Sequence, residues 1–268
     1  KGGEKEKVIK NSNYARRKIN SMKKSKTNQL EKLFIKWKDK QVNESEKDWK
    51  KTKGTTKYVS KSYFCEDGII DEKVFEKEKV KVLFITNEAN DDIKGLDENI
   101  DSSRVKAFKE YHDVKKDDWK GKLRERVCAI YKVIINNYDL HEYEVSHNFA
   151  FMNLNKRAGT KKITDKHIER YVELYKDEII SEIQIINPDI IVWLGINTYY
   201  LNQYLDAYLE DKRCYMNINS KRVPILRMPH TSYAFTLKDK PMDKFENKIN
   251  GKLATRIQKE LERFGIRT

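Results

Sequence analysis

Glu88, Asn153 and His230 each stand within a few residues of the end of a short apolar run, and their side chains offer complementary chemistry. A carboxylate can act as a general base on water or stabilise a developing positive charge. An amide both donates and accepts hydrogen bonds, and an imidazole can donate a hydrogen bond to a leaving-group oxygen or, when charged, stabilise an anion. Each of these side chains alone also fits a cap, a turn or an exposed surface. Whether they form a functional site therefore depends on how the fold places them relative to one another.

The apolar runs predict the strands that would position these residues. They are short, rich in β-branched residues and apolar on both faces, which is typical of buried parallel strands. Ligands of open parallel sheets bind beyond the carboxyl ends of the strands, so we expect the three side chains to meet in one crevice. The four runs are residues 81–85, 148–152, 189–194 and 223–228.

Helical patterns alternate with these runs and predict a three-layer α/β/α domain over residues 61–268, with a four-stranded, mainly parallel sheet. Asn28 and Glu31 have the spacing of a capping box, and the apolar stripe that follows predicts an amino-terminal helix packed on this core. Further helices are expected over residues 117–138, 164–187, 196–210 and 242–264.

Positive charge is concentrated in residues 1–60, which we treat as a basic arm followed by a helix. They contain 19 Lys and Arg against 7 Asp and Glu, whereas the rest of the chain is nearly neutral. The composition of residues 1–27 predicts a segment that is disordered or becomes helical only when bound. Basic arms bind nucleic acid by neutralising phosphates, although a solubilising tail is the alternative. The expected contacts are Arg16, Arg17, Lys18, Lys23 and Lys24.

Other features argue against several classes of protein. The three cysteines are far apart and form no CxxC pair, so we expect neither a structural zinc ion nor an iron–sulfur cluster. No stretch approaches the roughly 20 apolar residues of a membrane span, and no signal-peptide pattern is present. These features predict a protein of the reducing cytoplasm with no metal and no membrane partner.

The order of the polar motifs resembles that of the uracil-DNA glycosylase superfamily. Residues 86–90 are similar to the Gly-Glu-Ala-Pro-Gly type of motif that ends the family's first strand, and residues 153–157 to its base-reading asparagine followed by Lys or Arg. A strand ending at Leu194-Gly195 and a His-Pro-Ser-like motif at residues 229–232 follow in the same order. The resemblance covers about residues 80–265, and the serial order of four short motifs is its main support.

This resemblance implies a DNA glycosylase, which flips a nucleotide out of the duplex and hydrolyses its N-glycosidic bond to leave an abasic site. By this comparison Glu88 would position or activate water, and His230 would stabilise the departing base. Asn153 and Asn87 would contact the base. The other residues expected at the substrate are Phe108 and Tyr111 against the base, and Lys156, Arg157, Ser232 and Tyr233 against the DNA.

The chain departs from the family's motifs at several positions. Asn87 stands where the family usually has glycine, Asn90 where it has proline, and no proline follows His230. These differences fit a pocket for a uracil-like or modified pyrimidine, including the hypermodified cytosines of some phages, in either repair or defence. They equally fit a non-catalytic nucleic-acid- or partner-binding module on the same fold. We expect a monomer that needs no cofactor.

Overall fold

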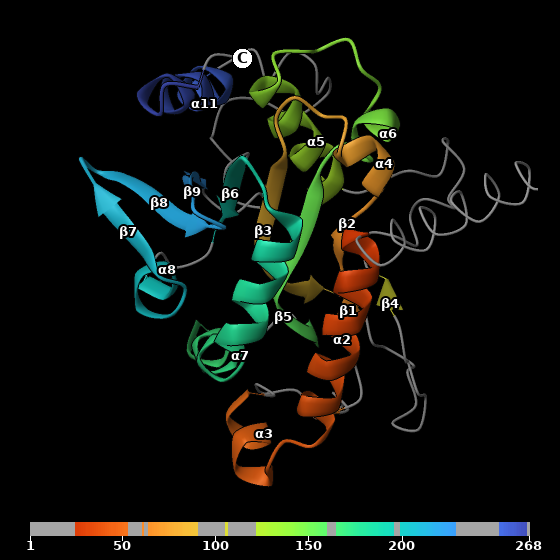
Figure 1. The fold of residues 1–268 in the computed structure, drawn as a ribbon. Helices are drawn as coiled ribbons and strands as arrows, with labels where there is room; N and C mark the ends of the chain where they lie inside the picture. Colours follow the sequence, from red (N-terminus) through yellow and green to blue (C-terminus); the bar gives the residue numbers. More distant parts are fainter. Residues whose placement is uncertain are drawn as a thin grey trace, which may run out of the picture.

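Seven strands form one mixed sheet in the centre of the protein (Figure 1). This computed structural model describes residues 25–52, 61, 64–90, 105–106, 122–159, 165–195, 199–228 and 252–266. A separate short pair joins β1 (Cys65–Glu66) to β4 (Val105–Lys106). The strand order in the main sheet is β2 (Gly68–Ile69), β5 (Ala150–Gly159), β3 (Val82–Asn90), β6 (Ile190–Leu194), β9 (Lys221–Met228), β8 (Arg213–Ile218) and β7 (Ala207–Glu210).

The four central strands are β5, β3, β6 and β9, and each runs parallel to its neighbour. This confirms the parallel strands expected from the four apolar runs. The predicted strand number was wrong, because β2, β8 and β7 add antiparallel strands at the two edges.

The segment after β6 shows why the prediction missed one edge. Residues 196–210 were expected to form one helix, but α8 (Tyr199–Tyr204) is followed by β7. Asp211 and Lys212 both have positive φ, which is the geometry of a tight turn between antiparallel strands. This turn pairs β7 with β8, and the pairing overrides the local helical pattern.

β3 and β5 continue beyond the apolar residues that predicted them. Thr86 pairs with Asn153 and Glu88 with Asn155 in the parallel register, so polar residues expected in loops belong to the strands. The side chains find partners inside the sheet, since Thr86 Oγ1 donates to Asn153 Oδ1 at 2.6 Å. The change from apolar to polar residues therefore does not mark the end of a strand. It marks the point at which side chains form hydrogen bonds within the sheet instead of packing in the apolar core.

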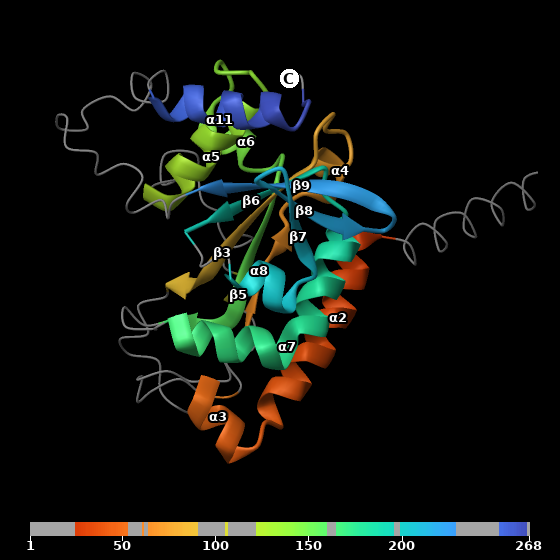
Figure 2. The same cartoon turned by 90° about the vertical axis from the view of Figure 1, so that its left-hand side faces the viewer.

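Helices cover both faces of the sheet (Figure 2). α2 (Lys26–Val42), α7 (Asp165–Ile186) and α8 pack against one face, and α5 (Lys122–Ile134) and α11 (Lys252–Arg263) against the other. Each interface buries its own apolar cluster, so the described elements form three layers. The shorter helices are α3 (Glu46–Thr52), α4 (Glu72–Phe75) and α6 (Glu142–Val145).

Apart from residues 196–210, the boundaries of the long helices agree with the sequence except at the start of α2. The N-cap is Ser25, whose Oγ accepts a hydrogen bond from the N–H of Asn28, so Asn28 lies in the first turn and is not the cap. α7 ends before Asn187-Pro188, as the proline predicted. α5 and α11 lie within their predicted ranges.

Candidate functional site at the carboxyl edge of the sheet

The carboxyl ends of the four parallel strands form the edge at which a site was expected. From β3 the chain crosses to β5 on one side, whereas from β6 it crosses to β9 on the other. Ligands of open α/β sheets bind where the direction of crossing reverses, which here lies between β3 and β6. Gly195, with a φ of +68°, follows β6 and donates its N–H to the carbonyl of Met228 at 2.8 Å. This bond ties the end of β6 to the end of β9.

Asn153 is held inside the protein by hydrogen bonds to β3 and to the segment before β2. Its Oδ1 accepts the hydrogen bond from Thr86, and its Nδ2 donates to Asp67 Oδ2 at 3.1 Å. The same Asp67 oxygen accepts the backbone N–H of Asn153 at 2.6 Å, and the residue is only 2% exposed. In this arrangement the amide joins β3 to β5 and is not presented to a base, contrary to the expected role.

A bulge in β5 explains the direction of the next two side chains. The register of β5 against β3 shifts after Glu88, which pairs with Asn155, while Ala89 pairs with Ala158. Lys156 and Arg157 are therefore the extra residues of the bulge. Both side chains point toward the layer formed by α2, α3 and α7, where they contact residues of those helices.

Lys156 forms a buried charge cluster with two carboxylates. Its Nζ pairs with Asp67 and lies 2.7 Å from Glu182 Oε2, and the three side chains are fully buried. The ammonium group also lies over the rings of Phe34 and Trp37, 5.5 and 5.2 Å from their centres. Its charge is thus balanced entirely by protein groups.

The two carboxylates of this cluster cannot both carry a charge at low energetic cost. Burial raises the pKa of Glu182 well above its ordinary value of 4.5, and the charge of Asp67 raises it further, against the attraction of Lys156. Burial alone would lower the pKa of Lys156, but Asp67 and Glu182 raise it above 10.5. The cluster therefore combines a charged lysine with a glutamic acid that holds its proton more tightly than it would in water.

Arg157 is also buried, at 1% exposure, and pairs with Glu44. Its guanidinium carbon lies 4.8 Å from the centre of the Trp49 ring and 5.0 Å from that of Tyr171. These contacts anchor the segment after α2 to α7. The expectation that Lys156 and Arg157 contact DNA is corrected, because both cations are enclosed by carboxylates and aromatic rings.

The remaining predicted residues are placed only in part. Asn87 lies half-buried on β3, and the backbone of Glu88 pairs with Asn155, although the side chain of Glu88 is outside the description. The other predicted residues lie outside the described ranges: Phe108, Tyr111, His230, Ser232, Tyr233, Arg16, Arg17, Lys18, Lys23 and Lys24. In sequence, His230 follows the end of β9 by two residues.

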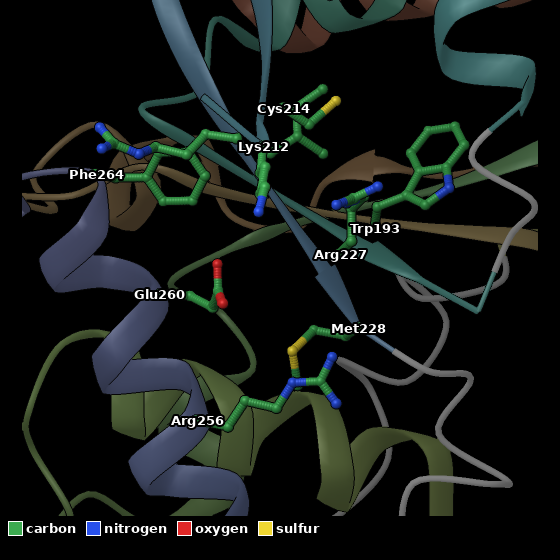
Figure 3. A pocket seen from close by; sticks show the side chains of 10 residues that line it. Trp193, Lys212, Cys214, Arg227, Met228, Arg256, Glu260 and Phe264 are labelled. Atoms are coloured by element: carbon green, nitrogen blue, oxygen red, sulfur yellow. The ribbon is translucent and has the colours of Figure 1, made fainter. Parts of the chain in front are cut away.

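A pocket of about 330 Å³ lies beside the ends of β6 and β9 (Figure 3). Arg256, Glu260 and Phe264 project into it from α11 and face Lys212 and Arg227 on the strand side. Arg213, at the start of β8, also lines it. This pocket was not predicted from the sequence, although Arg227 gives one signal for it by interrupting the last apolar run.

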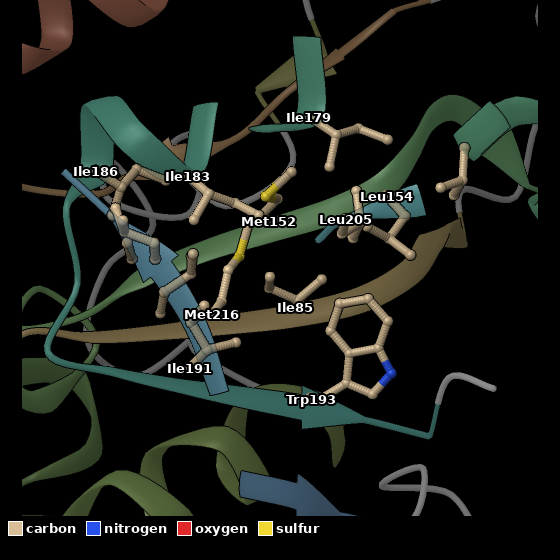
Figure 4. Packing of buried hydrophobic residues seen from close by; sticks show 14 of the residues in the cluster. Ile85, Met152, Leu154, Ile179, Ile183, Ile186, Ile191, Trp193, Leu205 and Met216 are labelled. Carbon is tan, nitrogen blue, oxygen red and sulfur yellow. The ribbon is translucent and has the colours of Figure 1, made fainter. Parts of the chain in front are cut away.

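Two other residues in the wall of the pocket are unsuited to chemistry. Trp193 is 1% exposed and packs in the core near Ile85 and Ile191 (Figure 4), so it offers no open stacking surface. Burial raises the pKa of the Cys214 thiol, which outweighs the opposing effect of Arg227. A neutral, buried thiol is a poor nucleophile. The chemical character of the pocket therefore comes from its positively charged side chains.

Comparisons with known proteins give no independent assignment. No protein-family model matches the chain, and no curated protein matches it. Among the described residues, no group of three or more His, Cys, Asp or Glu is arranged to hold a metal ion. Within the same ranges no helix has the length and apolar character required to cross a membrane.

Proposed function

We propose that the protein is a DNA glycosylase that excises a uracil-like or modified pyrimidine. The observation that supports this most is the parallel arrangement of β5, β3, β6 and β9, which brings the ends of four motif-bearing segments to one edge of the sheet. The cationic pocket at the same edge suits a polyanionic substrate.

In this proposal two residues carry the reaction. Glu88 orients or activates the attacking water while positive charge develops on the sugar. His230 donates a hydrogen bond to the departing base as negative charge develops on it. The burial of Asn153 assigns it to joining β3 and β5. The contact with the base then falls to Asn87, which is half-buried and directly precedes Glu88 on β3.

Three buried cysteines in the thiol form support an intracellular setting. Cys65, Cys128 and Cys214 form no disulfide and are enclosed by the core. Thiols of this kind persist in reducing compartments, so the proposal places the enzyme in the cytoplasm, where cellular or invading DNA is accessible.

The test is the release of free bases from a panel of duplex and single-stranded DNAs that contain uracil, hypoxanthine or phage-type modified cytosines. Mass spectrometry would identify the base, and alkaline cleavage would reveal abasic sites. We expect one base to be released and Glu88→Gln to slow its release by about 100-fold or more. Glu31→Gln, the same chemical change at an exposed position of α2, should leave the rate unchanged.

A second candidate function is a nucleic-acid-binding module without catalysis. The internal hydrogen bonds of Asn153 favour it, because they remove one residue expected to contact the base. Binding without any released base across the panel, with wild type and Glu88→Gln alike, would establish this function in place of the glycosylase.

A further inference from the structure

The pocket beside α11 contains more positive charge than the described part of the chain neutralises. Lys212, Arg213, Arg227 and Arg256 line it, and none of the four forms an ion pair with a carboxylate within the described ranges. Glu260 is the one carboxylate in the lining that the structure describes, and its Oε1 lies 2.6 Å from Arg263. Like charges gathered without counterions are unfavourable, so the pocket is suited to an anion.

Three separate elements bring these cations together. Lys212 and Arg213 come from the junction of β7 and β8, Arg227 from β9, and Arg256 from α11. The position of Arg227 is fixed by the pairing of β9 with β6. In this register Arg227 lies opposite Trp193, and the core residues Ile225 and Ile191 lie opposite each other. The arrangement is therefore fixed by the sheet and by the packing of α11, and not by one charged segment of sequence.

The cationic surface continues along α11. A second hollow, of about 450 Å³, is lined by Arg256, Lys259 and Arg263 and shares Arg256 and Glu260 with the pocket. The spacing of these cations, three and four residues apart, places them on one side of the helix, opposite the buried Ile257 and Leu261. They extend over about 10 Å of the helix axis.

We propose that the pocket and this side of α11 form a track for the phosphodiester backbone of nucleic acid, with the pocket holding one phosphate. Two adjoining cationic hollows match a chain of repeated anions better than a single small anion. Successive phosphates on one strand of duplex DNA are about 3.4 Å apart along the axis, so the α11 cations span about three of them. This inference rests on the proposed function in taking DNA as the polyanion, and it adds the surface that holds it.

The test is the salt dependence of binding of the full-length protein to an unmodified, fluorescein-labelled 20-base-pair duplex with 5′-hydroxyl ends. Fluorescence anisotropy would give the affinity between 50 and 300 mM salt, about the range over which counterion release is measured. For Lys212→Gln/Arg227→Gln we expect the slope of log affinity against log salt to become shallower by about 0.9, since the pocket holds one phosphate and each lost phosphate contact removes about 0.9.

Two further variants separate a phosphate track from a general effect of charge. Glu260→Gln removes the carboxylate from the pocket and should tighten binding. Lys32→Gln/Lys36→Gln removes two exposed cations from α2, in the layer on the other face of the sheet, and should leave the slope unchanged. Thermal unfolding of each variant would check that the fold is retained.

Equal slopes for the wild type, the pocket variant and the α2 variant would overturn the proposal. Tighter binding of a 5′-phosphorylated duplex, lost in the pocket variant, would also overturn it by reassigning the pocket to a terminal phosphate. The duplex contains no base to be excised, so this result is independent of glycosylase activity. If no base is released from any DNA, the proposed glycosylase function is wrong. The phosphate track is still tested separately, by the salt dependence of binding.

Discussion

Lys156 retains its charge in the interior because two carboxylates and two aromatic rings replace the water around its ammonium group. The cluster depends on its lysine, because removal of that cation leaves an uncompensated negative charge in a medium of low polarity. Its three members come from the segment before β2, from the β5 bulge and from α7. At the scale of single residues it therefore joins three distant parts of the chain.

Replacing Glu182 with Gln should remove part of the pH dependence of the free energy of unfolding. The folded protein holds a proton on Glu182 at pH values where the unfolded chain has lost it, because the folded pKa is raised above 4.5. The contribution of Glu182 to the stability of wild type is then lost as the pH rises above about 4.5, by at most roughly 1.4 kcal/mol per pH unit. Glu182→Gln mimics the protonated form and lacks this loss.

The measurement is urea denaturation of both proteins at several pH values from 4 to 8. The stability of Glu182→Gln relative to wild type should increase steadily with pH. A difference that is constant or shrinks over this range would show that Glu182 is ionised in the folded protein.

Replacing Lys156 with Met should be strongly destabilising. The variant retains the volume of the side chain but leaves Asp67 and Glu182 together without a cation, which costs about 3–5 kcal/mol for a buried pair. Urea denaturation at pH 7 would measure the loss. Lys36→Met, at an exposed position of α2, is the matched control and should change stability by no more than about 0.5 kcal/mol.

At the scale of elements, the approach of α2 to β2 depends on Gly68. This residue has a φ of +103°, and a Cβ atom added to it would lie 3.1 Å from Leu30 Cδ1 on α2 and 3.7 Å from Glu182 Oε1. The backbone conformation is accessible to glycine and costly for other residues. The close contact is what lets α2 cover this edge of the sheet.

Gly68→Ala should therefore lower the free energy of unfolding by about 3 kcal/mol, from backbone strain together with displacement of Leu30. Gly265→Ala is a control with the same change at a φ of +71° and no atom within 4 Å of the added Cβ, and it should cost only about 1 kcal/mol. Thermal and urea unfolding would compare the two. Equal losses would mean that the contact with α2 contributes nothing.

At the scale of the whole molecule, Glu72 marks where the basic arm meets the folded body. Its carboxylate accepts hydrogen bonds from Ser25 Oγ at 2.6 Å and from the backbone N–H groups of Lys26 and Thr27 at 2.7 and 2.9 Å. Burial would raise the pKa of Glu72, but these hydrogen bonds lower it below 4.5. The carboxylate thus caps the start of α2 and complements the helix dipole.

Two truncations should separate the arm from the fold. Removal of residues 1–24, which contain nine Lys and Arg against two Glu, should weaken DNA binding and make its salt dependence shallower with no change in unfolding temperature. Removal of residues 1–27 should give the same binding defect and also lower stability by about 1–2 kcal/mol, because the groups that bind Glu72 are lost. Binding isotherms and thermal unfolding measure the two effects. An unchanged salt dependence would show that the arm does not contact DNA, which favours the alternative of a solubilising tail.

The periodicity of apolar residues was sufficient to predict the central strands and the main helices. Runs such as 189–194 can be buried only as strands between layers, and α7 ends where Pro188 requires it. The edge strands escaped prediction because two-residue β2 and four-residue β7 exist only through their partners. Local pattern is a weak guide when pairing supplies the stability.

The candidate site also has features that the sequence predicts and others that depend on the tertiary structure. From the sequence alone follow the parallel strands, the serial order of the polar motifs and the concentration of basic charge in residues 1–60. Only the tertiary structure decided that Lys156, Arg157 and Asn153 face inward, because a bulge in β5 and carboxylates from distant segments determine their partners. It also decided that Lys212, Arg227 and Arg256 surround one pocket, since charges far apart in sequence act together only when the fold brings them within a few ångströms.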